Sequence, residues 1–265
     1  MSGADRIAEA FAAARADGRR AALMPYLMGG FPDLETSRRI GVAYAEAGAH
    51  LVELGVPFSD PLADGPVVHA AGTAALRAGV RLADVLEVGR EVAEHVPVVA
   101  MCYINPILAR GPERFVAALR DARISGLIVP DLSLEESAAL RASCDEAGIA
   151  LVPLVAPTTP DERLERIGAA ARGFLYTVSL TGTTGERASL DGDLPGLLDR
   201  VRRHASLPVA VGFGIGTPEQ AAGAAAAGAD GVIIGSRLVR AAGEEGDPVA
   251  AVSTLVREFS AALVH

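Results

Sequence analysis

The regular alternation of apolar runs with helical patterns is the feature that most constrains the fold of this chain. Each apolar run is short and nearly continuous, as in a parallel sheet that helices cover. The runs span 22–28, 50–55, 97–103, 126–131, 150–156, 173–179, 208–214 and 231–236. Eight strand–helix units in about 250 residues predict a (β/α)8 TIM barrel, with residues 1–265 forming a single domain. A doubly wound α/β sheet is the alternative, but it usually needs fewer strands.

Two further helices are expected at the ends of this repeat. Before the first run, Ile7 and Phe11 share one face of a short amphipathic helix. After the last run, Gly235 and Ser236 open a short helix whose N-terminal amides are suited to phosphate binding. Within the repeat, Ser133 and Glu136 have the spacing of a capping box and predict a helix start.

Composition excludes several classes of function. The net charge is −9 and basic runs are absent, which argues against nucleic acid as a partner. No apolar run reaches the roughly 18 residues of a membrane span, so we expect a soluble, cytoplasmic protein without a membrane partner. All 24 basic residues are arginine, so a lysine Schiff base to a substrate or to pyridoxal phosphate is impossible. The two cysteines and five histidines lack metal-ligand spacing, so no metal is expected.

Acidic residues interrupt and follow the second apolar run, in "LVELGVPFSDPLADGP" (51–66). If Val52 and Leu54 face the helices, the alternation of side chains points Glu53 into the barrel mouth. Burial there would raise its pKa toward the range useful for proton transfer. Asp60 and Asp64 follow in a loop that prolines restrict. A structural hydrogen bond for the glutamate, and turn or cap roles for the aspartates, are the alternatives.

Glycine-rich segments follow the last three runs. Barrels often bind phosphate in the loops after strands seven and eight, which here contain Gly214, Gly235 and Ser236. The polar segment 182–193 after the sixth run is suited to closing over a substrate, and we expect it to be mobile without one. Tight turns without a ligand, and a plain surface loop, are the alternatives.

Taken in order, these segments resemble the tryptophan synthase α subunit family over nearly the whole chain. The motifs are "PYLMGGFPD", "LVELGVPFSDPLADGP", "MCYINPI", "LIVPDLSLEES", "APTTP", "YTVSLTGTTGER", "VGFGI" and "IIGS". The resemblance implies a carbon–carbon lyase that splits indole-3-glycerol phosphate into indole and glyceraldehyde 3-phosphate. It also implies an α2β2 heterotetramer, in which pyridoxal phosphate belongs only to the β subunit and indole reaches that subunit through a tunnel.

The resemblance also implies a role for each matching residue. Glu53 matches the general acid and base, and Asp64 matches the carboxylate that binds the indole N–H. The other matches are phosphate-binding residues (Gly182, Gly214, Gly235, Ser236), residues near the substrate and the closing loop (Tyr176, Thr184), residues around the indole pocket (Tyr26, Tyr103, Asp131) and partner-interface residues (Pro57, Asp60).

Three other functions stay open at this point. A stand-alone lyase that releases free indole would have the same acids and phosphate residues. Another phosphate-binding barrel, such as a sugar-phosphate isomerase or epimerase, is disfavoured by the "PFSDPLADGP" segment. A non-catalytic regulatory barrel is disfavoured by the presence of both Glu53 and Asp64.

Overall fold

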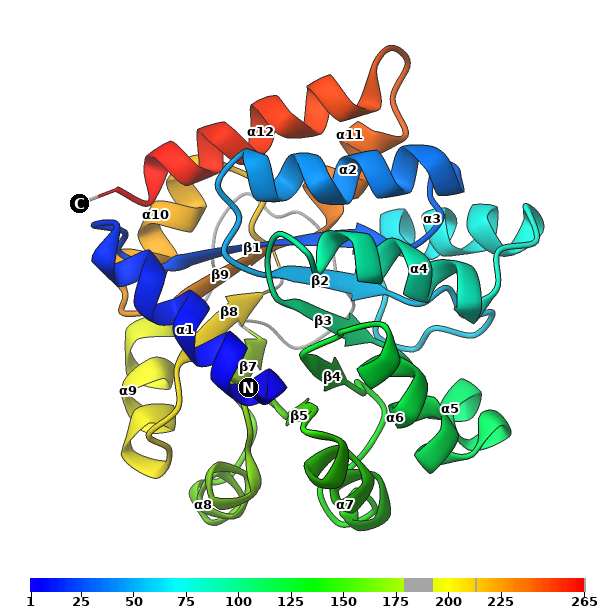
Figure 1. The fold of residues 1–265 in the computed structure, drawn as a ribbon. Helices are drawn as coiled ribbons and strands as arrows, with labels where there is room; N and C mark the ends of the chain where they lie inside the picture. Colours follow the sequence, from blue (N-terminus) through cyan, green and yellow to red (C-terminus); the bar gives the residue numbers. More distant parts are fainter. Residues whose placement is uncertain (179–192, 213, 265) are drawn as a thin grey trace.

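The computed structural model describes residues 1–178, 193–212 and 214–264, which contain a nine-stranded, all-parallel sheet. The strands are β1 (Ala22–Met28), β2 (Val52–Gly55), β3 (Val98–Met101), β4 (Gly126–Ile128), β5 (Ala150–Val152), β6 (Leu154–Val155), β7 (Leu175–Val178), β8 (Val209–Gly212) and β9 (Gly231–Ile234). Their order is β5-β4-β3-β2-β1-β9-β8-β7-β6. The two end strands are consecutive in sequence, so the sheet curls into a nearly closed barrel (Figure 1). The predicted TIM barrel is confirmed.

Pro153 is the reason for nine strands where the sequence pattern predicted eight. The expected strand 150–156 is divided at this residue into β5, which pairs with β4, and β6, which pairs with β7. Proline has no backbone N–H and cannot donate to a ladder. Its carbonyl still accepts from the Tyr176 N–H at 3.0 Å. All eight predicted runs therefore contain strands, and the run 150–156 contains two of them.

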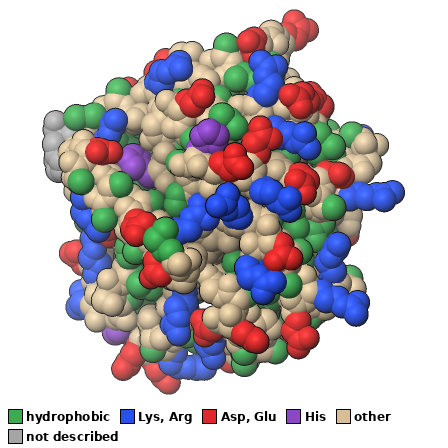
Figure 2. All heavy atoms as spheres, in the orientation of Figure 1, with side chains coloured by type: hydrophobic (Ala, Val, Ile, Leu, Met, Phe, Trp, Pro, Cys, Tyr) green, Lys and Arg blue, Asp and Glu red, His purple; other side chains and the backbone are tan. Residues whose placement is uncertain are grey.

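The helices of the described residues are α1 (Gly3–Ala16), α2 (Leu34–Glu46), α3 (Pro66–Arg77), α4 (Leu82–Val92), α5 (Ile104–Arg110), α6 (Pro112–Asp121), α7 (Ala138–Ala147), α8 (Asp161–Ala170), α9 (Leu194–His204), α10 (Pro218–Ala226), α11 (Ser236–Ala242) and α12 (Pro248–Ala262). All but α1 lie on the outer side of the barrel (Figure 1), and acidic and basic side chains are interspersed over the face shown in Figure 2. None of these helices is long and apolar enough to cross a bilayer. The short α11 directly after β9 confirms the predicted helix at that position.

The predicted start of α7 was wrong. The Glu136 N–H donates to Ser133 Oγ at 3.4 Å, as a capping box would have it. The backbone N–H groups of Leu132, Glu136 and Ser137, however, each bond to a carbonyl three residues earlier. These bonds are separate turns that do not propagate as an α-helix, so α7 begins only at Ala138.

Helix α1 fills the amino-terminal end of the barrel and confirms the predicted extra helix. Ile7 and Phe11 are fully or almost fully buried, and both belong to a cluster formed by inward-facing strand residues such as Met24. The Phe11 and Phe174 rings lie 5.8 Å apart between centroids. With this end packed by side chains, a cavity is left at the carboxyl ends of the strands.

Candidate active site

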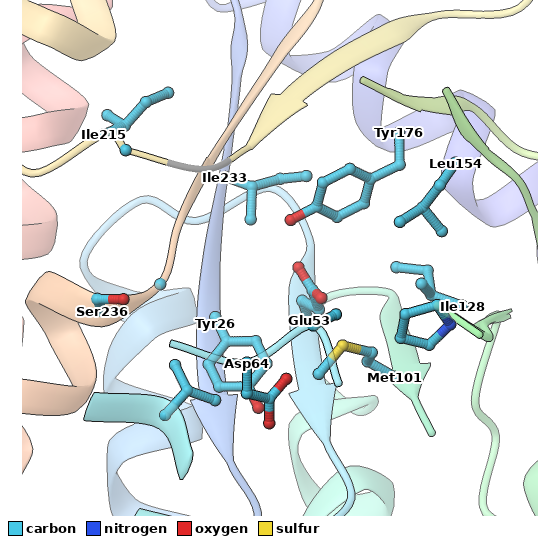
Figure 3. A pocket seen from close by; sticks show the side chains of 15 residues that line it. Tyr26, Glu53, Asp64, Met101, Ile128, Leu154, Tyr176, Ile215, Ile233 and Ser236 are labelled. Carbon is cyan, nitrogen blue, oxygen red and sulfur yellow. The ribbon is translucent and has the colours of Figure 1, made fainter. Parts of the chain in front are cut away.

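A cavity lies at the carboxyl ends of the strands (Figure 3). The wall is mostly apolar, with a few polar groups that converge from different elements. Its members are Tyr26, Glu53, Ala63, Asp64, Val68, Met101, Ile128, Pro130, Leu154, Tyr176, Gly214, Ile215, Ile233, Gly235 and Ser236.

Glu53 projects from the middle of β2 into this cavity. Leu51 belongs to the barrel-interior cluster, whereas Val52 and Leu54 belong to the cluster under the helices, as the predicted alternation requires. Glu53 is only 3% exposed, and its Oε2 atom has no hydrogen-bond partner among the described residues. Burial, and secondly the charge of Asp64, raise the pKa of this carboxyl to about 8. Glu53 therefore holds a proton at neutral pH and is poised to give it up.

Asp64 reaches the cavity from the loop between β2 and α3. The Tyr103 hydroxyl donates to Asp64 Oδ1 at 2.8 Å and accepts from the Ala63 N–H at 3.0 Å, which fixes the carboxylate. Burial raises the pKa of Asp64, while the Tyr103 hydrogen bond and the nearby His69 act to lower it. Tyr103 stacks on Phe58, with ring centroids 5.2 Å apart.

Tyr26 enters the cavity from β1 and Tyr176 from β7, and the two side chains lie on either side of Glu53 (Figure 3). The register of β1 and β2 pairs Tyr26 with Glu53. Each ring lies over a glycine, because a Cβ added at Gly55 would overlap the Tyr26 hydroxyl, and one at Gly212 would overlap the Tyr176 hydroxyl. Burial raises the pKa of both phenols further above their ordinary value, so both stay neutral.

The described phosphate candidates lie on one side of the cavity. Gly214 has a φ of +80°, which suits glycine. Gly235 precedes the first residue of α11, and Ser236 is buried at the start of that helix. Gly182 and Thr184, together with most of the expected closing segment, lie outside the described residues.

The remaining predicted residues surround the cavity without forming its wall. Asp131 Oδ1 accepts from the Ile104 N–H at 2.9 Å, at the start of α5. In the loop after β2, Pro57 is buried and Asp60 is exposed. The sequence did not predict the apolar wall, because an apolar residue at a strand end has the same pattern as a core residue. It also gave no signal for Phe58 in the loop after β2 or for His69 in α3, whose contacts depend on the fold.

The described residues hold no group of three or more His, Cys, Asp or Glu side chains arranged as a metal site. The titratable side chains that line the cavity are two carboxyl groups and two phenols. A parallel β/α barrel with two carboxyl groups in its strand-end cavity, one of them protonated, belongs to the class of acid–base barrel enzymes.

Comparison with known proteins identifies the family. The family model described as tryptophan synthase alpha chain matches residues 11–263. A tryptophan synthase alpha chain from Synechococcus elongatus is 48% identical over 259 residues, covering 97% of this chain and 96% of its own. One from Methanosarcina mazei is 43% identical over 260 residues, covering 98% and 95%. The chain belongs to the tryptophan synthase α chain family.

Solved structures agree with this result. A structure of Mycobacterium tuberculosis tryptophan synthase has a TM-score of 0.91 at 39% identity and covers 98% of both chains. A structure of the tryptophan synthase α2β2 complex from Pyrococcus furiosus has a TM-score of 0.84 at 37% identity, covering 90% of this chain and 97% of that one.

Proposed function

We propose that this chain is the α subunit of a tryptophan synthase and cleaves indole-3-glycerol phosphate into indole and glyceraldehyde 3-phosphate. Membership of the family supports the reaction. The observation that carries the proposal is the buried carboxyl of Glu53, whose pKa of about 8 makes it a proton donor at neutral pH. The sequence has no lysine, so a Schiff-base aldolase mechanism is excluded.

The reaction needs one proton to be given and one to be taken, and Glu53 is suited to both steps. The protonated carboxyl first gives its proton to C3 of the indole ring, which leaves the ring positively charged. The resulting carboxylate then takes the proton from the hydroxyl on the carbon attached to C3. As the O–H electrons form the aldehyde C=O, the C–C bond breaks and its electrons neutralise the ring. Glu53 ends the cycle protonated, as it began.

Asp64 is the second catalytic group in this proposal. A carboxylate that accepts from the indole N–H stabilises the positive charge that protonation at C3 creates. The hydrogen bond from Tyr103, 2.8 Å long, holds Asp64 in position and favours its ionised form. Asp131 supports the site through the bond that it accepts from Ile104.

The substrate lies with its phosphate toward α11 and its indole ring among apolar side chains. Gly182, Gly214, Gly235 and Ser236 hold the phosphate, chiefly through backbone N–H groups. Tyr26, Tyr176 and Thr184 contact the substrate, and Met101, Ile128 and Leu154 supply apolar wall for the ring. The segment 182–193 closes over the occupied cavity.

The proposed partner is a tryptophan synthase β subunit, with Pro57 and Asp60 at the interface. The similarity of this chain to a chain of the Pyrococcus furiosus tryptophan synthase α2β2 complex supports such an assembly. Pyridoxal phosphate belongs to the β subunit in this proposal, and the α chain needs no cofactor of its own. We also propose that residues 1–265 form a single domain and that the protein is cytoplasmic, without a nucleic acid or membrane partner.

The substitution Glu53→Gln tests the proposal, because it keeps the shape of the side chain and removes its titratable proton. With the β subunit present, we expect cleavage to slow by about 10²- to 10⁴-fold while the circular dichroism spectrum is unchanged. Glu258→Gln is the matched control, since it makes the same chemical change at an exposed position of α12. Unchanged turnover in the Glu53→Gln variant would exclude this residue as the proton donor.

A further inference from the structure

Two buried polar atoms in the cavity wall have no hydrogen-bond partner among the described residues. They are the Tyr26 hydroxyl and Glu53 Oε2, on side chains that neighbour each other across β1 and β2. A buried polar group without a partner destabilises the fold, so such groups are uncommon unless a ligand or water completes them. The mechanism above accounts for Glu53, whereas for Tyr26 it names only a contact with the substrate and no partner for the hydroxyl.

The Tyr26 ring is held firmly in one place. It packs with Val68 and Ala71 of α3 and with Val239 of α11 in a small buried cluster. Its backbone carbonyl accepts from the Tyr44 hydroxyl at 3.3 Å. The hydroxyl is therefore fixed by packing rather than by a hydrogen bond of its own.

Gly55 makes room for this hydroxyl. A Cβ at position 55 would overlap the Tyr26 hydroxyl and its ring carbon Cζ. Gly55 lies on the same face of β2 as Glu53 and two residues closer to the cavity mouth. The hydroxyl consequently lies between Glu53 and the loop that carries Asp64, and both carboxyl groups influence its ionisation.

Among the polar groups of the proposed substrate, only the glycerol hydroxyls are suited to pair with the Tyr26 hydroxyl. Asp64 accepts from the indole N–H, and the glycine and serine amides near α11 hold the phosphate. The two hydroxyls of the glycerol chain lie between the phosphate and the ring, and the only contact that the mechanism gives them is the proton transfer from one of them to Glu53. The groups of the cavity wall follow one another in the same order as the groups of the substrate. β9 leads into α11 at the phosphate end, β2 leads to Asp64 at the indole end, and β1, which carries Tyr26, lies between these two strands (Figure 3).

We infer that the Tyr26 hydroxyl hydrogen-bonds the glycerol hydroxyls of the substrate, and that Gly55 is the residue that makes this contact possible. The inference rests on the proposed function and adds a specificity element to it. A phenol both donates and accepts, so it matches a hydroxyl at either carbon. An occupant that lacks both hydroxyls leaves the phenol unpaired and gains nothing from it.

Tyr26→Phe tests the inference, because it removes one oxygen atom and keeps the ring. The probes are indole-3-glycerol phosphate, turned over with the β subunit present, and indole-3-propanol phosphate, which keeps the ring N–H and the phosphate but lacks both hydroxyls. We expect kcat/KM to fall at least about fivefold, with the Kd of the hydroxyl-free probe within about twofold of the parent value. A fall in kcat would assign the contact to the reacting hydroxyl, and a rise in KM alone would assign it to the second hydroxyl.

Two further variants sharpen the test. Gly55→Ala keeps the phenol but displaces it, so the same selective loss is expected. Tyr103→Phe releases Asp64 from its hydrogen bond, so both probes should bind more weakly. An unchanged kcat/KM in Tyr26→Phe would overturn the inference, as would an equal loss of affinity for the hydroxyl-free probe. A parent chain that cleaves no substrate at all would instead overturn the proposed function, and the inference with it.

Discussion

The protonation of Glu53 makes a prediction about folding stability that is independent of enzyme activity. Its pKa is raised from 4.5 to about 8 in the folded chain. The folded state therefore binds this proton more tightly than the unfolded state does. Stability from this group is fully present below pH 4.5 and is lost as the pH rises to about 8. Glu53→Gln stays neutral at every pH and has no such loss.

The size of the effect follows from the size of the shift. Each pH unit between the two pKa values is worth about 1.4 kcal/mol, so a shift from 4.5 to about 8 sets an upper limit of roughly 5 kcal/mol. Between pH 5 and pH 9, the free energy of unfolding of Glu53→Gln should gain about 1–4 kcal/mol relative to the parent.

Urea unfolding at several pH values measures this difference directly. Contributions from other titrating groups appear in both proteins and largely cancel. The control Glu258→Gln, at an exposed position, should follow the parent curve at every pH. Parallel curves for Glu53→Gln and the parent would show that Glu53 ionises normally, and would refute its role as a proton donor at neutral pH.

Four other substitutions test the packing and electrostatics of the fold. Gly55→Ala forces a methyl group against the confined Tyr26 ring and should lower the free energy of unfolding by about 1–3 kcal/mol. Gly223→Ala, at an open position of α10, should instead raise it by up to about 1 kcal/mol. Equal urea midpoints for the two variants would contradict this. Phe11→Ala removes the ring with which α1 fills the barrel end and should cost about 3–5 kcal/mol in urea unfolding; a loss under about 1 kcal/mol would mean that α1 adds little. His50 accepts from the Leu23 N–H at 3.2 Å, and burial, followed by the charge of Arg19, lowers its pKa below 6.5. The folded state thus resists protonation of His50, so the parent should lose stability as the pH falls through 6.5 and His50→Asn should lose less; a steeper acid loss in the variant would refute this.

The barrel could be predicted from the sequence because each strand carries a local signal. Parallel strands covered by helices are apolar throughout, and the eight runs mark them without reference to tertiary contacts. The break at Pro153 was missed because the run around it is as apolar as the others. Whether a proline ends a strand depends on whether its neighbour needs the missing N–H, which is a property of the pairing.

The orientation of Glu53 could be predicted, but its surroundings could not. Alternation along β2 places Glu53 inside once Val52 and Leu54 are outside. The contact of Tyr103 with Asp64 joins residues 39 positions apart, and the pairing of Tyr26 with Glu53 depends on strand register. Neither contact has a signal in the local sequence. The unpaired hydroxyl of Tyr26 could therefore be found only in the structure.

The start of α7 shows the opposite error, in which a local signal was present but insufficient. Ser133 Oγ accepts from the Glu136 N–H and donates to the Glu136 carboxylate, yet the helix begins at Ala138. A serine can satisfy a backbone donor in a turn as well as at a helix start. In this chain the bond lies in the loop between β4 and the helix.

The central claim is tested most directly by indole release from indole-3-glycerol phosphate, measured with the purified chain in the presence and absence of a tryptophan synthase β subunit. The account predicts slow release by the chain alone and strong acceleration by the β subunit. Fast release that is indifferent to the β subunit would indicate a free-standing lyase. No release under either condition would contradict the proposed reaction.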